Sequence, residues 1–185
     1  MAAINYAAEI VKELQRSAAL IADAEAGTLA DLLLQANRVF VVGAGRSGLM
    51  GRAFAMRLMH AGISAYVVGE TITPGIDQGD VLIVGTGSGE TRSLIPMAQQ
   101  AKSLGASLVA VTIAPESTIG RLADAVVKLP GSPKAQASGS SASIQPMASL
   151  FEQTLLIFYD AVILSLMDRQ GQDADRMYGR HANLE

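Results

Sequence analysis

The sequence predicts an α/β fold in which helices on both sides cover a five-stranded parallel sheet. Two observations lead to this fold class. Short apolar segments rich in β-branched residues alternate along the chain with longer segments of helical pattern, as in βα units. The short segments are apolar throughout rather than at every second residue, so both faces of the sheet are expected to be buried. The expected architecture has three layers and is flavodoxin-like, with additional N-terminal helices.

Local signals place the individual elements along the chain. Residues 3–36 are rich in Ala, Leu and Glu and indicate two helices, with a break near Ala26-Gly27-Thr28. Residues 69–79 are rich in turn residues, and a polar tail runs to Glu185. Strands are expected at residues 38–42, 65–68, 80–84, 107–113 and 125–129. Further helices are expected at residues 47–61, 92–104, 117–123 and 147–169, with Ser117 as an N-cap.

Length, charge and residue counts narrow the functional classes. The 185 residues are expected to form one domain, residues 1–185, with N-terminal helices (1–36), an α/β core (37–145) and a last helix with its tail (146–185). A net charge of −3 gives nucleic-acid binding no electrostatic support. The chain has no cysteine, which excludes thiolate catalysis, and its two histidines are His60 and His181.

The chain is unusually apolar for a soluble protein. Hydrophobic residues make up 50% of it, and the mean hydropathy is +0.31. No apolar run reaches the roughly 18 uninterrupted residues that a membrane span needs, so no membrane association is expected. The surplus apolar surface is expected to be buried between copies of a homo-oligomer. The first residues lack the basic region of a secretory signal, and the expected compartment is the cytoplasm.

The first glycine-rich loop, Gly43-Ala-Gly-Arg-Ser-Gly48, follows an expected strand and opens a helix. It matches the G-x-G-x-x-G pattern of dinucleotide sites, and Glu70 stands where such a site places its ribose-binding acid. Two observations weigh against a dinucleotide. A second glycine loop has no place in that pattern, and the chain leaves little room for a separate substrate domain.

The second loop is Gly85-Thr-Gly-Ser-Gly-Glu-Thr91, again after an expected strand and before a helix. Backbone amides, hydroxyl groups and a helix N-terminus that meet at one point are typical of an anion site. No lysine follows the last glycine, so this is not a Walker A loop, and a small sugar phosphate suits it better than ATP. The alternative is that the glycines only form tight turns and the hydroxyl groups only cap helices. Two such loops at the carboxyl edge of one sheet favour a shared ligand, bound by Arg46, Ser47, Thr86, Gly87, Ser88, Gly89, Glu90 and Thr91.

Together, the two loops resemble those with which the SIS (sugar isomerase) domain family holds a phosphosugar. The resemblance covers nearly the full chain and favours one branch of the family. In this comparison Ser47, Thr86, Ser88 and Thr91 match the hydroxyl positions that hold phosphate, and Glu152 matches the isomerase base. Four further segments carry the resemblance: Met56-Arg-Leu-Met-His-Ala-Gly62, Val68-Gly-Glu-Thr-Ile-Thr-Pro-Gly75, Ser143-Ile-Gln-Pro-Met-Ala-Ser-Leu-Phe-Glu-Gln153 and Arg180-His-Ala-Asn-Leu-Glu185.

The resemblance implies that D-arabino-hex-3-ulose 6-phosphate and D-fructose 6-phosphate are interconverted through a cis-enediol, without a cofactor. This step follows 3-hexulose-6-phosphate synthase in formaldehyde fixation by the ribulose monophosphate pathway. The resemblance also implies a homotetramer with active sites near its subunit interfaces. No metal is expected, because no acids and histidines stand at ligand spacing. The alternatives are another phosphosugar isomerase, or a non-catalytic phosphosugar-binding module of a regulator, whose output domain would not fit in 185 residues.

The reaction needs a proton to leave one carbon and return at the next. One carboxylate over both carbons can perform both transfers when burial brings its pKa toward neutrality. Glu152 is the only acid between Asp124 and Asp160 and lies among apolar residues, although a first-turn glutamate is also favoured by the helix dipole. Arg46 could stabilise the enediolate or form a surface ion pair.

The functions of the two histidines and of one loop each have two interpretations. His60 could shuttle a proton or simply end its helix, and His181 could reach the site of a neighbouring subunit. The sequence does not choose between them. The loop of residues 131–145 is a candidate lid or a plain connector, with Lys134 as a candidate phosphate contact or a solvated lysine.

Overall fold

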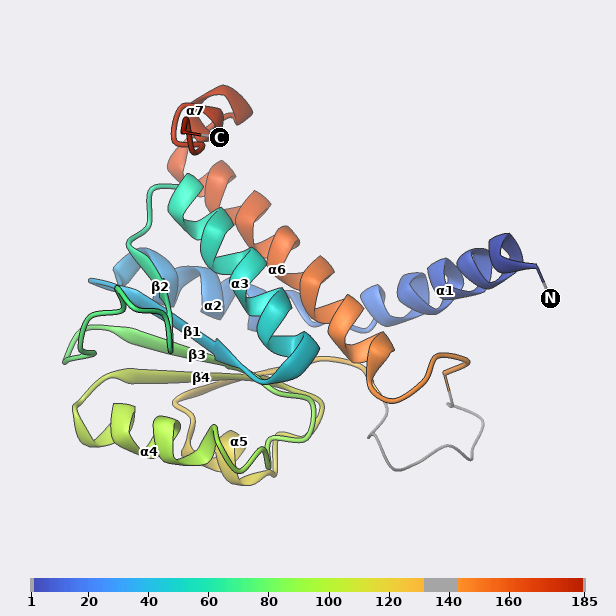
Figure 1. The fold of residues 1–185 in the computed structure, drawn as a ribbon, viewed down its shortest axis with the longest axis horizontal. Coiled ribbons are helices and arrows are strands. Elements are labelled where there is room, and N and C mark those ends of the chain that lie inside the picture. Colours follow the sequence, from blue (N-terminus) through green and yellow to red (C-terminus); the bar gives the residue numbers. More distant parts are fainter. Residues whose placement is uncertain (1, 132–142, 185) are drawn as a thin grey trace.

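The structure, a computed structural model, describes residues 2–131 and 143–184. Its centre is a five-stranded parallel sheet with the strand order β2-β1-β3-β4-β5, which is flavodoxin-like (Figure 1). This confirms the predicted fold class. The strands are β1 (Val39–Gly43), β2 (Ala65–Val67), β3 (Val81–Gly85), β4 (Ser107–Thr112) and β5 (Ala125–Lys128).

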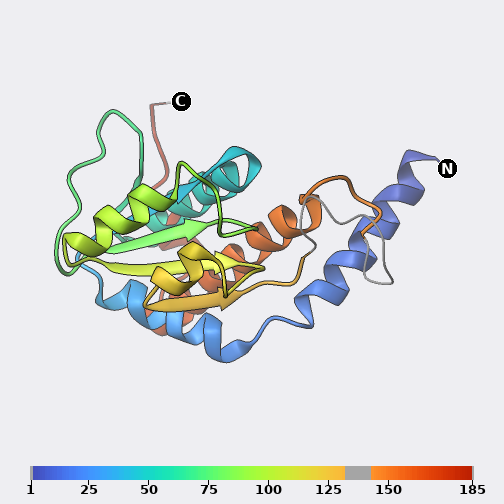
Figure 2. The same ribbon diagram turned by 90° about the horizontal axis from the view of Figure 1, so that it is seen from below.

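Helices cover both faces of the sheet. One face packs against α2 (Asp23–Gln35), α3 (Gly45–His60) and α6 (Ser149–Gln170), and the other against α4 (Ile95–Ser103) and α5 (Thr118–Leu122). The helix α1 (Ala3–Ala18) projects away from the sheet in both views, and α7 (Ala174–Tyr178) lies near the C-terminus (Figures 1 and 2).

The core divides into two layers because successive strand residues point to opposite faces. Val39, Val41 and Ile83 face the layer beneath α2, α3 and α6, whereas Phe40 and Leu82 face the layer beneath α4 and α5. Each of these five side chains is at most 2% exposed. The sheet is therefore buried on both faces, as its uninterrupted apolar strands predict.

The strand order places the topological switch point between β1 and β3. These strands pair in register from Val39 opposite Val81 to Gly43 opposite Gly85. The chain leaves β1 towards β2 on one side and leaves β3 towards β4 on the other. The carboxyl ends of β1 and β3 therefore form the crevice in which open α/β sheets bind their ligands.

The predicted break in the N-terminal helices is wrong. The structure ends α1 at Ala18 and begins α2 at Asp23, so Gly27 lies inside α2. Asp23 in the first turn favours a helix start at that point through the helix dipole. A Cβ on Gly27 would come within 3.7 Å of the Arg169 guanidinium, which packs against α2. An internal glycine costs a helix roughly 1 kcal/mol, and the ion pair between Arg169 and Asp31 joins α2 to α6 in this region.

Two further boundaries differ from the predictions. The helix α4 begins at Ile95 instead of residue 92, because Pro96 lacks an amide hydrogen and is tolerated in the first helical turn. The expected polar tail contains the short helix α7, whose first turn is capped by the Asp173 carboxylate through the Arg176 amide. The expected N-cap at Ser117 is confirmed, since its hydroxyl accepts the Gly120 amide.

The helix α6 is long and apolar enough to cross a membrane by length and composition alone. Half of its most apolar stretch is buried in the fold, and it crosses the sheet beside α3 (Figure 1). The same helix carries Glu152, which is 8% exposed. We therefore assign α6 to the core, where it also brings an acid to the edge of the sheet.

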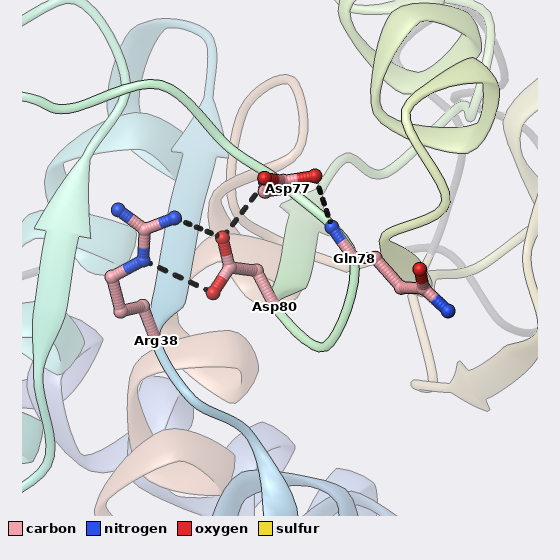
Figure 3. A network of polar contacts seen from close by, with 4 residues as sticks. All are labelled: Arg38, Asp77, Gln78 and Asp80. Carbon is pink, nitrogen blue, oxygen red and sulfur yellow. Dashed lines mark hydrogen bonds and ion pairs between the residues drawn. The ribbon is translucent and has the colours of Figure 1, made fainter.

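An ion pair joins β1 and β3 at the amino edge of the sheet, opposite the glycine loops (Figure 3). Asp80 is 1% exposed and accepts two hydrogen bonds from Arg38, from Nε at 3.1 Å and from Nη2 at 2.6 Å. It also accepts the backbone amide of Asp77 at 2.8 Å, and the Asp77 carboxylate accepts the amide of Gln78. The buried carboxylate is thus fully paired, which its burial requires.

We expect Arg38→Met to lower the free energy of unfolding by about 2–4 kcal/mol, because it leaves the buried Asp80 charge without its partner. Urea denaturation at a fixed protein concentration measures this loss. Arg52→Met is the matched control. Its partner Glu70 is 41% exposed, so the same change should cost less than about 1 kcal/mol. Equal losses in the two variants would contradict the prediction.

Candidate active site

The two glycine loops meet at the switch point. The first follows β1 and the second follows β3, and Gly43 and Gly85 are paired residues of adjacent strands. A Cβ on Gly43 would lie 2.9 Å from the Gly48 nitrogen and 3.1 Å from the Gly85 oxygen. A Cβ on Gly48 would lie 2.6 Å from the Gly43 oxygen. Only glycine allows this close backbone approach, which brings both loops to one edge.

The first loop turns directly into α3. Gly45 has a φ of +59°, in the left-handed region that glycine adopts without strain. Ser47 lies in the first turn of α3 and is 9% exposed, with Arg46 before it on the solvent side. The unpaired amides of this first turn and the Ser47 hydroxyl provide donors for an anion at a helix N-terminus.

The second loop is held by its own side chains. The Thr86 hydroxyl lies 3.2 Å from the Thr91 hydroxyl and accepts the Gly89 amide at 3.3 Å. The Ser88 hydroxyl is exposed and accepts the Glu90 amide at 3.2 Å, which leaves its hydrogen available for a ligand. The loop therefore presents donors in a fixed arrangement before any ligand binds.

The glycines of the second loop are also sites of close packing. A Cβ on Gly87 would lie 3.2 Å from the Phe151 ring, so the start of α6 rests on the loop. A Cβ on Gly89 would lie 1.8 Å from the Ser117 hydroxyl oxygen, and Gly89 has a φ of +64°. The loop is therefore packed between the start of α6 and the start of α5.

Arg46 joins the first loop to α6. Its Nη1 lies 3.1 Å from a carboxylate oxygen of Glu152 and donates to the Ser149 hydroxyl at 2.9 Å. The Glu152 side chain is 10% exposed, whereas that of Arg46 is 51% exposed. A buried carboxylate and a partly solvated guanidinium thus lie next to the anion donors of the first loop.

Glu90 is directed away from this pair. Its carboxylate accepts the Thr118 amide at 2.6 Å, at the start of α5. The hydrogen bonds from Thr118, first from its backbone and then from its side chain, hold the pKa of Glu90 below its usual value. This contact fixes the loop to α5.

Glu70, the acid of the dinucleotide alternative, forms an exposed ion pair with Arg52.

The two histidines lie together at the other end of α3. His60 is the last residue of that helix and is 3% exposed. Its ring stacks on that of His181 with 5.4 Å between centroids, and its Nδ1 lies 3.2 Å from Arg57 Nη1. The rings border a cavity of about 450 Å³ whose wall includes Asp160 and Tyr178. About 20 Å of helix separates His60 from Ser47, so within one chain the histidines do not reach the loops.

The structure thus brings Arg46 and Glu152 into contact beside the glycine loops and places His60 and His181 elsewhere. One participant, Ser149, was missed from the sequence. It lies three residues before Glu152, on the same side of α6, and a hydroxyl at that spacing could have been a signal. Lys134 and most of the candidate lid, residues 131–145, lie outside the described residues, which in this loop are 131 and 143–145.

Comparison with known proteins places the chain among sugar isomerases. The SIS domain model matches residues 32–157. The chain is 56% identical over 185 residues to the 3-hexulose-6-phosphate isomerase of Bacillus subtilis (strain 168), and covers all of both chains. It is 45% identical over 173 residues to that of Mycobacterium gastri, covering 94% of this chain and 86% of the relative.

A solved structure agrees with these relatives. A Methanococcus jannaschii protein, whose crystal structure infers a molecular function of 3-hexulose-6-phosphate isomerase, superposes with a TM-score of 0.79 at 33% identity. The match covers 97% of this chain and 96% of that one. The relatives found by sequence and the solved structure therefore indicate the same family over nearly the whole chain.

We expect the protein to lose stability as the pH falls through about 6.5, and His60 to cause part of this loss. Burial, then the charges of Arg57 and His181, lower the pKa of His60 below its usual value of 6.5. The unfolded chain then binds more protons than the folded one, so acid favours unfolding. Unfolding free energies measured between pH 7.5 and 5.5 should show a shallower slope in His60→Gln, by at most about 1.4 kcal/mol per pH unit. Identical slopes would remove His60 as a cause.

Proposed function

Because the chain belongs to the SIS domain family and, within it, to the 3-hexulose-6-phosphate isomerases, we propose that it interconverts D-arabino-hex-3-ulose 6-phosphate and D-fructose 6-phosphate. One observation carries this assignment: the contact of Arg46 with Glu152 beside two anion-binding glycine loops. We propose that residues 1–185 act as one SIS unit in the cytoplasm and use the product of 3-hexulose-6-phosphate synthase.

The phosphate binds at the glycine loops. Ser47 and the amides of the first turn of α3 approach it from one side, and Thr86, Ser88 and Thr91 approach it from the other. Hydroxyl groups and backbone amides at a helix N-terminus are donors that suit a phosphate group. Gly87 and Gly89 let this loop pack closely against Phe151 and Ser117, while Glu90 holds the loop against α5.

Glu152 transfers the proton. In the direction of fructose 6-phosphate, its carboxylate takes the proton from C2 of the 3-ketose and returns it to C3 of the cis-enediol. The hydroxyl proton passes from O2 to O3, so the carbonyl moves from C3 to C2 and the overall oxidation state of the sugar does not change. The reaction therefore needs no hydride acceptor, and we propose that it uses no cofactor.

Arg46 stabilises the negative charge both before and after the proton transfer. Before the transfer, its guanidinium pairs with the Glu152 carboxylate at 3.1 Å. When the carboxylate takes the proton, the negative charge passes to the enediolate oxygen of the substrate. The partly exposed guanidinium has further N–H donors for that oxygen, so one arginine can stabilise both states.

We propose that the histidines serve the active site of a second copy in a homotetramer. His60 and His181 lie together in one chain and far from the Glu152 of the same chain, so any contact with the reacting sugar needs another subunit. The chain also exposes apolar side chains along α1, among them Ile4 (75% exposed) and Val11 (62%), on a helix that projects from the fold (Figure 2). Such surface favours burial between copies.

Nuclear magnetic resonance on fructose 6-phosphate in D₂O tests the function. Conversion to the 3-ketose with deuterium at the exchanged carbon is the expected result. Turnover of an aldose phosphate instead would favour another phosphosugar isomerase. Binding without turnover or exchange would favour a phosphosugar-binding module.

Glu152→Gln should lower kcat by about 10²–10⁴-fold with little change in KM. It keeps the shape of the side chain but removes the base, and the phosphate donors remain. Deuterium incorporation should fall in parallel, because exchange and isomerisation share the enediol. Circular dichroism and oligomer mass must match those of the wild type. A correctly assembled variant with wild-type turnover would assign the base to another residue.

Ser88→Ala should raise KM for the sugar phosphate by about tenfold or more, because a hydrogen bond to a charged group contributes about 1.5–3 kcal/mol. Inorganic phosphate should compete with substrate in the wild type and compete less well in the variant. Steady-state kinetics with phosphate as inhibitor measures both effects. An unchanged KM together with absent phosphate competition would remove this loop from the active site.

Mixing two inactive variants tests the shared site. Glu152→Gln supplies chains with intact histidines, and His60→Gln supplies chains with an intact carboxylate. If each site draws these groups from two chains, assemblies refolded from an equal mixture should recover up to about a quarter of the wild-type activity. Full activity of His60→Gln alone, or no recovery in a mixture whose tetramer mass is intact, would contradict a shared site.

A further inference from the structure

A buried carboxylate on α1 has no part in the reaction described above. Glu13 is 6% exposed, although α1 projects from the fold and most of its side chains are exposed. One oxygen accepts the Ile144 amide at 2.8 Å. The other accepts the Ser143 hydroxyl at 2.7 Å and the Gln145 side-chain amide at 3.0 Å. Glu13 therefore binds three consecutive residues that lie 130 positions or more along the chain.

The charge of Glu13 is well stabilised. Burial raises its pKa, but the hydrogen bonds from Gln145, Ser143 and Ile144 and the charge of Arg16 outweigh this effect, and the pKa lies below its usual value. The carboxylate thus stays ionised and keeps all of its acceptor positions. An ionised carboxylate with three donors is a stronger attachment than a neutral side chain would form.

The segment held by Glu13 leads directly to the active site. The carbonyl of Pro146, the next residue, accepts the Ser149 hydroxyl at 2.9 Å and the Ser149 amide at 3.2 Å. The same Ser149 hydroxyl accepts a hydrogen bond from Arg46, whose Nη1 also lies 3.1 Å from Glu152. Contacts therefore continue without a gap from Glu13 to the proposed base.

The backbone between these contacts is strained. Met147 has a φ of +58° and is the one non-glycine residue with a positive φ within residues 2–131 and 143–184. Its side chain does not explain this conformation, because Met147 is 72% exposed. Such a conformation persists where the surroundings on both sides fix it. Glu13 fixes residues 143–145 on one side, and Ser149 fixes Pro146 on the other.

We propose that Glu13 is a positioning residue, which holds residues 143–147 in place and thereby sets the position of Ser149, Arg46 and Glu152. The proposal rests on the proposed function for its catalytic consequence. It gives α1 a role within its own chain: the helix fixes the entry to α6. Loss of the clamp lets the strained turn relax, and the guanidinium and carboxylate lose their alignment over the sugar.

Glu13→Gln tests the proposal, because it removes the charge and turns one acceptor into a donor that faces at least one of the three donors. The expected result is a kcat lower by about 10- to 100-fold with KM within about twofold of wild type, since the phosphate loops are not touched. Hydrogen–deuterium exchange at the amides of residues 144–152 should become at least about tenfold faster. Glu9→Gln makes the same change on the same helix at an exposed residue paired with Lys12, and should change neither readout.

Gln145→Ala removes one of the three donors to Glu13 and provides a second test if Glu13→Gln fails to assemble. It should lower kcat in the same direction, and the double variant should be no worse than Glu13→Gln alone. Wild-type exchange in Glu13→Gln, faster exchange with wild-type kcat, or a loss carried by KM would each overturn the proposal. Failure of the wild type to isomerise fructose 6-phosphate would overturn the proposed function, and amide exchange would still decide whether Glu13 holds the segment.

Discussion

The close approach of backbone at the switch point is the constraint on which the site depends. A Cβ on Gly43 would meet the Gly48 nitrogen and the Gly85 oxygen, so the ends of β1 and β3 and the start of α3 share one small volume. A single methyl group at Gly48 would meet the Gly43 oxygen at 2.6 Å and push the first turn of α3 away. The anion donors of both loops converge because the backbone itself is in contact, not because side chains reach across a gap.

At the amino edge of the same two strands, side chains also join the strands. There, Arg38 and Asp80 join β1 and β3 through a buried ion pair, so the pairing of the strands is fixed by side chains (Figure 3). In the proposed site, the carboxyl edge leaves its donors free for a phosphate, and glycine packing allows this. Side chains thus fix the amino end of the two strands, and the candidate ligand site lies at their carboxyl end, as expected for an open α/β sheet.

Much of this arrangement could be predicted from the sequence, because its signals are local. Uninterrupted apolar runs, two of which end in the glycine loops, indicated the strands to within about one residue, a normal margin for element ends. The break in the N-terminal helices could not be placed, because α2 is joined to α6 by an ion pair between Asp31 and Arg169, a residue far along the chain. Ser149 and the clamp at Glu13 were missed for the same reason: their partners are more than 100 positions away.

The charge of the site explains why a loop arginine and a helix carboxylate are placed in contact. In the proposed mechanism, proton transfer moves one negative charge from the Glu152 carboxylate to the substrate oxygen. Arg46 is neutralised before and after the transfer, so the site does not build up net charge in a region where Glu152 is nearly buried. This benefit depends on geometry, because an arginine displaced by an ångström would stabilise either the carboxylate or the enediolate and not both. The proposed mechanism therefore requires a rigid entry to α6, and the contacts from Glu13 through Pro146 to Ser149 join that entry to α1.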